Sequence, residues 1–405
     1  MSVTRPLAPP ASPGSAVAPD PAAAFEPAAA FEPPAYPYDR LDDAKAVAVA
    51  RFGSVIDLSI GTPGDPPPPA VLRALDPVDD ADRSSRGYPA SIGGLELRRA
   101  IVDWTAKRFG VAIGVDQVAA CIGTKEFVAT TPQWLRLRNP KRDTVLYPAV
   151  SYPTYEMGAR LAGLRPVPVA LDDRWSIDVA SISADDARRA LMLWVNTPGN
   201  PAGGLDDLES VAQWGLANDV PIFSDECYAE FTWAGPPTTI LGRGSGPEGL
   251  GGVVAVHSLS KRSNMAGLRL GWYAGDPDLV GYLREVRKHA GLMVPGPVQK
   301  AGAVALGDQG HVEVQRNRYR TRLERAARLL SDVGVPSSTP DGGFYLWVAV
   351  PGGDEWAWTA EIAERAGVLV SPGSFYGPGG AGYVRLAMVA PLEDLDAMAL
   401  RLGLA

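Results

Sequence analysis

The chain of 405 residues has few of the residue types that several functions require. Its two cysteines, Cys121 and Cys227, are too few for a disulfide framework, and their apolar surroundings suit buried thiols. Its three histidines, His257, His289 and His311, leave little material for a multi-histidine metal site or a Ser-His-Asp triad. We therefore expect no metal, and we expect His257 to be packed rather than catalytic.

Long apolar runs and excess positive charge are also missing. No stretch approaches the roughly 18–20 apolar residues that a membrane span requires. The formal net charge of −8 argues against a nucleic-acid surface. With 46% hydrophobic residues, a chain of this length can bury a large core. We expect a cytoplasmic enzyme with small-molecule partners, no nucleic acid and no membrane.

The first 37 residues differ from the rest in being rich in proline and alanine. The segment Pro21–Glu26 is repeated at once as Pro27–Glu32. The segment lacks a basic start followed by a continuous apolar run, so it does not resemble a secretion signal. We expect residues 1–37 to form a disordered arm.

Lysine is scarce as well, with seven among the 38 basic residues. One of them, Lys261, lies in the segment Ser258–Gly271, which directly follows the apolar run Val253–His257 and contains several small residues. Such a lysine could be a solvated surface charge. At the end of a buried strand, however, its amine can hold an aldehyde cofactor as a Schiff base, and the obvious candidate is pyridoxal 5'-phosphate.

Two further apolar runs end in polar clusters, and the stretch between them has helical spacing. Leu191–Val195 leads into Asn196–Gly203, and Val220–Phe223 leads into Ser224–Tyr228. Residues Leu205–Asn218 between them have apolar side chains at helical intervals. A strand, helix and strand in this order predict a parallel sheet.

The polar residues after these strands have complementary chemistry. Ligands bind outside the carboxyl ends of parallel strands, so we expect Asn200, Asp225, Tyr228 and Lys261 to converge there. Asp225 can keep a pyridine nitrogen protonated, which makes the ring an electron sink. Asn200 and Tyr228 can bind the ring's phenolic oxygen, and Lys261 can then act as the proton-transferring base.

A phosphate group needs its own donors. Gly123, Thr124 and Lys125 follow the apolar stretch Val118–Ile122 and open a helical run, and backbone N–H groups at such a helix start bind phosphate. This turn taken alone would be an ordinary helix start. Ser258 and Arg269 would complete the phosphate site, because a guanidinium suits a phosphate dianion.

Together these residues resemble the fold-type I pyridoxal phosphate enzymes of the aspartate aminotransferase superfamily. The match runs from about Tyr38 to the C-terminus and includes the ungapped pattern from Ser260-Lys261 to Gly271. It implies an α/β fold with a mostly parallel central sheet, helices on both faces, and a smaller α/β domain. The large domain would span residues 64–305, and the small domain residues 38–63 and 306–405.

The resemblance also implies roles for residues outside the strand ends. Arg385 would bind the substrate's α-carboxylate, with Gly61 beside it near the entrance. Tyr152 would stack on the cofactor ring, or Tyr147 or Tyr155 if the register differs. Tyr88 would reach the phosphate of a neighbouring subunit, which implies a homodimer. In the small domain, a helix around 316–330 has an arginine-rich face that we expect to be solvated.

Within the superfamily, residues 58–66, 87–98 and 152–156 are similar to the succinyldiaminopimelate transaminases of bacterial lysine biosynthesis. This similarity implies amino transfer from glutamate to N-succinyl-2-amino-6-oxopimelate in two ping-pong half-reactions. Arg86 is then a candidate contact for the distal anionic end of that substrate.

Other functions remain open. Aspartate or another amino acid could be the donor, and pyridoxal phosphate lyases, including C–S lyases, share the same lysine, aspartate and asparagine. The segment from Ser258 to Lys261 also fits the Ser-x-x-Lys element of penicillin-binding enzymes, but their Ser-Asp-Asn and Lys-Thr-Gly partners do not occur. A ligand-sensing regulator would need a DNA-binding module, and the arm has neither the length nor the helical periodicity of a winged helix.

Overall fold

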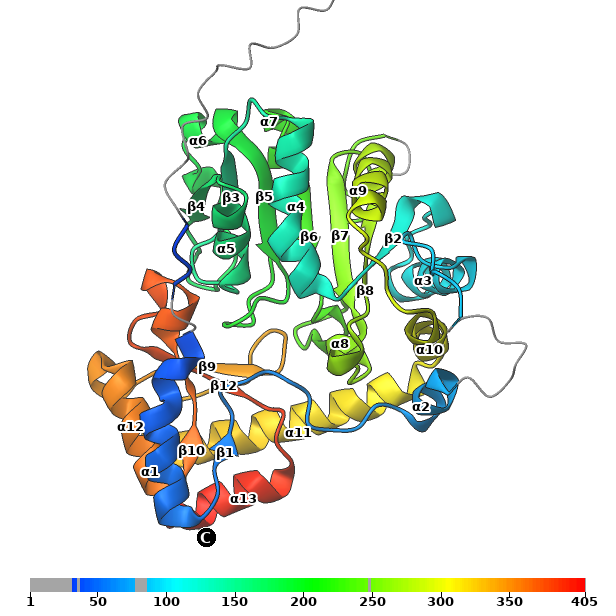
Figure 1. Cartoon of the computed structure of the whole chain (residues 1–405). Helices are drawn as coiled ribbons and strands as arrows, with labels where there is room; N and C mark the ends of the chain where they lie inside the picture. Colours follow the sequence, from blue (N-terminus) through cyan, green and yellow to red (C-terminus); the bar gives the residue numbers. More distant parts are fainter. Residues whose placement is uncertain (1–30, 35–36, 77–85, 247–248, 405) are drawn as a thin grey trace, which may run out of the picture.

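The computed structural model describes residues 31–34, 37–76, 86–246 and 249–404. A seven-stranded sheet with flanking helices forms the upper part in Figure 1, and shorter strands with further helices form the lower part. The long helix α11 (Gly310–Asp332) runs beneath the upper part towards the lower one.

The seven-stranded sheet has the order β2-β8-β7-β6-β5-β3-β4. Neighbouring strands are parallel from β7 to β4, whereas β8 is antiparallel to both of its neighbours. The strands are β2 (Val118–Cys121), β3 (Thr144–Pro148), β4 (Arg165–Val169), β5 (Ala190–Asn196), β6 (Ile222–Asp225), β7 (Val253–Ser258) and β8 (Gly271–Gly275). The prediction of a mostly parallel central sheet is confirmed.

Helices cover both faces of this sheet, because alternate residues of each strand pack into different cores. Leu193 and Val195 of β5 join one core, with residues of α3, α7 and α10. Met192 and Trp194 join the other, with residues of α4, α5 and α9. These helices are α3 (Leu95–Phe109), α4 (Thr124–Arg138), α5 (Thr154–Leu161), α7 (Leu208–Asn218), α9 (Pro277–His289) and α10 (Gly296–Gly307).

The lower part contains two small sheets and a core of its own. β12 (Tyr383–Ala387) lies between β11 (Ser371–Pro372) and β9 (Tyr345–Ala349), antiparallel to both, and β1 (Ile56–Asp57) pairs in parallel with β10 (Val368–Leu369). Apolar residues of these strands pack with the helices α11, α12 and α13. The remaining helices are α1 (Asp42–Phe52), α2 (Pro69–Leu75), α6 (Ala184–Arg189), α8 (Leu259–Arg262), α12 (Glu355–Ala366) and α13 (Leu392–Arg401).

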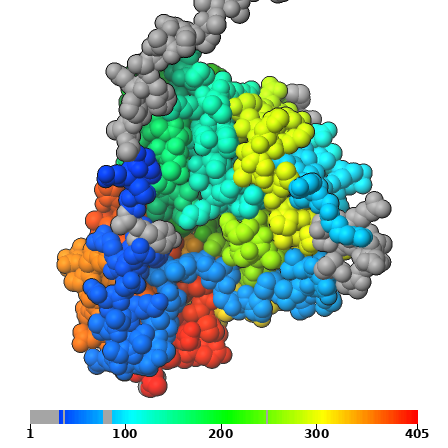
Figure 2. All heavy atoms as spheres, viewed as in Figure 1, coloured from blue at the N-terminus to red at the C-terminus, as the bar shows by residue number. Residues whose placement is uncertain are grey.

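The chain between β1 and α2 crosses the molecule. Figure 2 shows this stretch in light blue, beneath the parts coloured cyan and green. An ion pair attaches it to α11, since Arg322 donates to both carboxylate oxygens of Asp65 at 2.7 and 2.9 Å. Arg322 is buried. The expectation that the arginine-rich face of this helix is solvated is therefore wrong at Arg322, because the crossing segment covers that residue.

Two other predictions need adjustment or lie outside the described residues. The predicted helix Leu205–Asn218 begins at Leu208, because the carboxylate of Asp207 accepts hydrogen bonds from the first backbone N–H groups and caps the helix there.

Residues 1–30 and 35–36 of the predicted arm are outside the described residues. The domain boundaries stay a prediction, and among the described residues no helix is long and apolar enough to span a membrane.

Candidate active site

A cavity of about 490 Å³ lies at the carboxyl ends of β5, β6 and β7. The predicted site residues that line it are Gly61, Thr124, Lys125, Tyr152, Asn200, Asp225, Tyr228, Ser258, Lys261, Arg269 and Arg385. The four basic side chains in this set face one acidic side chain, that of Asp225, among the lining residues that the structure describes. The cavity therefore suits an anionic ligand.

Lys261 lies in the short helix α8, directly after β7. Its Nζ donates a hydrogen bond to the backbone carbonyl of Gly61. Burial, followed by the nearby charge of Arg385, lowers the pKa of Lys261 to about 8. A larger fraction of the amine is then neutral at physiological pH, as a nucleophile requires.

Asp225 ends β6 at the floor of the cavity and is buried. Its carboxylate accepts hydrogen bonds from the hydroxyl of Tyr155 at 2.9 Å and from the backbone N–H of Cys227 at 3.2 Å. Burial raises the pKa of Asp225, although these hydrogen bonds oppose the shift. A cationic group against this carboxylate would keep it ionised.

Asn200 and Tyr228 follow β5 and β6, and both contact residues of the lower part. The Asn200 amide oxygen accepts a hydrogen bond from Arg385 at 2.8 Å. The hydroxyl groups of Tyr228 and Tyr345 lie 2.8 Å apart. The cavity is thus built from segments far apart in the sequence.

The start of α4 forms one end of the cavity. The helix begins at Thr124, directly after Gly123, whose φ of 70° is the left-handed conformation that favours glycine. A Cβ on Gly123 would lie 2.8 Å from the guanidinium carbon of Arg269. Arg269 itself has a φ of 56°, which non-glycine residues rarely adopt and which often marks a functional site. Close by, the hydroxyl groups of Ser258 and Ser260 are 2.8 Å apart.

Arg385 is buried in β12 without a carboxylate partner among the described residues. Its guanidinium donates to neutral oxygens, those of Asn200 at 2.8 Å and the Ser59 carbonyl at 2.6 Å. Its Nε has no hydrogen-bond partner in the part of the chain that the structure describes. The rings of Tyr345 and Tyr376 lie beside the guanidinium at 4.2 and 4.9 Å. Burying a charge without a counter-charge is costly, so this arrangement suits an anionic ligand.

The tyrosines proposed for ring stacking occupy different places. Tyr152 and Tyr155 both line the cavity, whereas Tyr147 lies in the core beneath it and is absent from the lining. The Tyr155 ring already stacks on Trp194, with centroids 5.4 Å apart. Tyr88 is 98% exposed and does not line the cavity.

Several lining residues escaped the sequence prediction: Tyr38, Tyr155 as a partner of Asp225, Cys227, Ser260, Tyr345 and Tyr376. Ser260 adjoins Lys261, so its place in the motif could have indicated it. Tyr345 and Tyr376 come from the lower part, and no local pattern in the sequence indicates their contact with the cavity. The expectation that His257 is packed is confirmed, since it lies buried against Trp104 and Trp272.

The residues present fit pyridoxal 5'-phosphate. Lys261 offers an amine for the aldehyde, and Asp225 offers a buried carboxylate for the ring nitrogen. The start of α4, Ser258 and Arg269 offer donors for the phosphate. The unpaired Arg385 offers a cation for a substrate carboxylate.

Comparison with known proteins agrees with this chemistry. Residues 53–402 match the family model "Aminotransferase class I and II". A probable aminotransferase of Mycobacterium tuberculosis is 40% identical over 375 residues, covering 91% of this chain and 85% of that protein. The 4-dedimethylamino-4-oxo-anhydrotetracycline transaminase of Streptomyces rimosus is 37% identical, with coverage of 91% and 99%.

Two further similarities concern diaminopimelate. The LL-diaminopimelate aminotransferase of Aquifex aeolicus is 34% identical, covering 89% of this chain and 94% of that protein. The solved structure of a probable N-succinyldiaminopimelate aminotransferase from Thermus thermophilus superimposes with a TM-score of 0.80 at 31% identity, covering 91% and 100% of the two chains.

Proposed function

The chain belongs to the class I and II aminotransferases, which are pyridoxal 5'-phosphate-dependent enzymes, and on that premise we propose a diaminopimelate derivative as its substrate. The specific reaction is transamination between N-succinyl-LL-2,6-diaminopimelate and 2-oxoglutarate, with glutamate as the donor in the biosynthetic direction. Similarity to one protein named for this substrate and to others named for LL-diaminopimelate supports the choice.

The proposal that the substrate is an anionic amino acid rests mainly on Arg385. This residue is a buried cation with no carboxylate partner among the described residues. Its fork binds the substrate's α-carboxylate, with Gly61 beside it, in two charge-assisted hydrogen bonds. Its hydrogen bond to Asn200 then links the substrate's position to the cavity wall.

Bound in the cavity, pyridoxal phosphate supplies an aldehyde for the amino group and a ring that withdraws electrons from the substrate's α carbon. Lys261 would hold the cofactor through its Nζ, and as a free amine the same nitrogen would move the proton of the substrate's α carbon. Asp225 keeps the ring nitrogen protonated, and Asn200 and Tyr228 donate to the phenolic oxygen. Tyr152 packs against the ring.

The start of α4 and the residues near it bind the phosphate group of the cofactor. Gly123 forms the turn before the helix, Thr124 and Lys125 would offer donors to the phosphate at the start of α4, and Ser258 and Arg269 would add a hydroxyl and a guanidinium. Tyr88 supplies a further hydroxyl to the site of a second subunit, so the functional unit is a homodimer. Its full exposure leaves it accessible for that contact.

A second candidate substrate is a polycyclic ketone of the kind named for the Streptomyces rimosus relative, which is 37% identical over 99% of its length. The aromatic rings of Tyr38, Tyr152, Tyr345 and Tyr376 around the cavity are compatible with such a ligand.

A donor panel tests the proposal. The purified enzyme, loaded with pyridoxal phosphate, would be given glutamate, aspartate, LL-diaminopimelate and its N-succinyl derivative with suitable keto acids, beside Lys261→Ala. We expect kcat/KM for the succinyl derivative to exceed that for aspartate by at least about tenfold, or 1.4 kcal/mol. A preference for aspartate, or thiol release from a cysteine conjugate, would instead favour an aspartate aminotransferase or a C–S lyase.

A further inference from the structure

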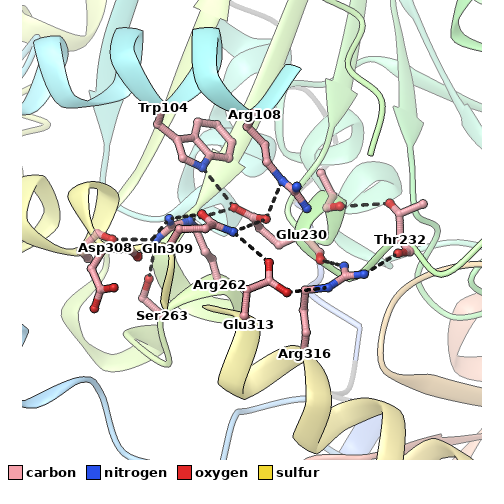
Figure 3. Close-up of polar contacts among 12 residues, drawn as sticks. Trp104, Arg108, Glu230, Thr232, Arg262, Ser263, Asp308, Gln309, Glu313 and Arg316 are labelled. Carbon is pink, nitrogen blue, oxygen red and sulfur yellow. Dashed lines mark hydrogen bonds and ion pairs between the residues drawn. The ribbon is translucent and has the colours of Figure 1, made fainter. Parts of the chain in front are cut away.

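A second cluster of charged residues, outside the lining of the cavity, is centred on Glu230 (Figure 3). Glu230 lies in the short helix that directly follows Tyr228 and is 4% exposed. One carboxylate oxygen accepts hydrogen bonds from Arg262 Nε at 3.0 Å and from the Trp104 indole at 3.1 Å. The other lies 2.8 Å from Arg108 Nε. We call Glu230 and these three partners the Glu230 cluster.

Arg262 is the neighbour of Lys261 in α8, and the two side chains go to different places. Lys261 lines the cavity, whereas Arg262 enters the Glu230 cluster. Besides Glu230, the Arg262 guanidinium donates to the Ala305 carbonyl at 2.8 Å, the Ser263 hydroxyl at 3.2 Å and the Gln309 amide oxygen at 3.0 Å. Each of its nitrogens has a partner, so the side chain is held in one direction.

Glu230 belongs to the same segment as Tyr228, and this segment is also attached to α11. Arg316 of α11 donates to the backbone carbonyls of Glu230 and Thr232. Figure 3 shows this arginine approaching from the helix below, while Arg108 approaches from α3 above. Two segments that border the cavity, one with Lys261 and one with Tyr228, are thus tied to one buried group.

We propose that Arg262 and Glu230 are positioning residues that fix the direction from which Lys261 enters the cavity. The inference rests on the proposed role of Lys261. α8 has only four residues and makes no long helical ladder of its own, so its orientation depends on side-chain anchors such as Arg262. A base or nucleophile that is misplaced by about 1 Å can lose about a hundredfold in rate.

The cluster offers a matched pair of variants. Arg262→Lys keeps the positive charge but loses the planar fork that contacts α10 and Gln309. Arg108→Lys makes the same chemical change at the same carboxylate, but from α3, which is not adjacent to Lys261. Both variants weaken the Glu230 cluster, but only Arg262→Lys changes a side chain of α8, the helix that contains Lys261.

The test uses the complete enzyme loaded with pyridoxal phosphate. We would measure the dissociation constant of the cofactor, the pH midpoint of the absorption change of the lysine-bound cofactor, and kcat and KM for the best amino donor. For Arg262→Lys we expect a cofactor dissociation constant about tenfold higher, a shifted pH midpoint, and a lower kcat at unchanged KM. For Arg108→Lys we expect an unshifted pH midpoint, and a cofactor dissociation constant, kcat and KM within about twofold of the wild type.

The outcomes separate this inference from the proposed function. If the wild type binds no pyridoxal phosphate through a lysine, the proposed function fails first. If the wild type behaves as proposed but Arg262→Lys matches Arg108→Lys in cofactor affinity, pH midpoint and kcat, the positioning role is wrong. Circular dichroism and thermal melting of both variants show whether they are equally folded, and Glu230→Asp provides a second variant on the carboxylate side.

Discussion

The molecule buries arginine in two contrasting ways. Arg262 is paired with Glu230 and has a partner for each of its nitrogens. Arg385 is equally buried but contacts neutral oxygens, and its Nε has no hydrogen-bond partner within the described ranges. A buried charge without a counter-charge lowers stability. The difference indicates that Arg262 is held in one place by its protein partners, whereas Arg385 is kept ready for a ligand.

The contrast extends to the surroundings of each arginine. Arg108 and Arg262 flank Glu230, and their charges hold its pKa below the usual range although burial raises it. Around Arg385 are the rings of Tyr345 and Tyr376, which stabilise a cation without neutralising it. A free cation beside Lys261 also lowers the pKa of that lysine. The unpaired arginine thus prepares both the ligand site and the amine.

The largest expected effect comes from removing the counter-charge in the paired region. Glu230→Gln would leave Arg108 and Arg262 without a carboxylate, which should lower the free energy of unfolding by about 3–5 kcal/mol. Arg385→Gln removes a charge that has no carboxylate partner among the residues described, so we expect a change in the free energy of unfolding within about 1 kcal/mol. Urea unfolding of both variants without ligand compares them. Equal losses would remove the distinction between the two arginines.

For catalytic activity we expect the opposite order, with the larger loss in Arg385→Gln than in Glu230→Gln. We expect Arg385→Gln to lower kcat/KM for amino donors by roughly 30- to 4,000-fold, which corresponds to the 2–5 kcal/mol of a buried, hydrogen-bonded charge pair. Arg385→Lys serves as the control that keeps the charge without the fork. Steady-state kinetics with glutamate measure the effect, and a loss below about threefold would mean that the α-carboxylate binds elsewhere.

A third prediction concerns the amine beside the unpaired arginine. In the cofactor-free enzyme, the rate at which pyridoxal phosphate is captured should rise with pH through a midpoint near 8, because the pKa of Lys261 is lowered to about 8. In Arg385→Gln the midpoint should move upwards, since the nearby positive charge is gone. Stopped-flow absorbance over a pH series measures both. A midpoint that does not move would show that the charge of Arg385 does not contribute to the lowered pKa of Lys261.

The smallest effect is expected at the ion pair that joins the crossing segment to α11. The hydrogen bonds from Arg322 and Gln315 hold the pKa of Asp65 below its usual range, although partial burial opposes them. A carboxyl with a depressed folded pKa stabilises the protein above its unfolded pKa of about 4 and loses this contribution as the pH falls through the folded value. We therefore expect Asp65→Asn to cost about 1 kcal/mol at neutral pH, with little difference from the wild type in strong acid.

Thermal unfolding of Asp65→Asn and the wild type at neutral and acidic pH measures this difference. Asp186→Asn is a suitable control, because it removes an ion pair with Arg165 at the far edge of the sheet. A deficit of Asp65→Asn that persisted unchanged in acid would show that packing, rather than charge, holds the crossing segment.

Much of the cavity follows from local patterns in the sequence. Polar residues directly after apolar runs indicated Asn200, Asp225 and Lys261, because the carboxyl ends of parallel strands share one edge. Contacts between segments that are far apart in the chain leave no such pattern in the sequence. Nothing local in the sequence pairs Glu230 with Arg262, and nothing places Tyr345 beside Tyr228 across 117 residues. The buried Arg322 was missed for the same reason.

The most direct test of the central claim uses the scarcity of lysine. The enzyme loaded with pyridoxal phosphate would be reduced with borohydride, digested and mapped by mass spectrometry, beside Lys261→Ala. Of the seven lysines, we predict that Lys261 alone carries the reduced cofactor and that the variant carries none. Label on another lysine, or unchanged label in the variant, would contradict the assignment of this cavity as the active site.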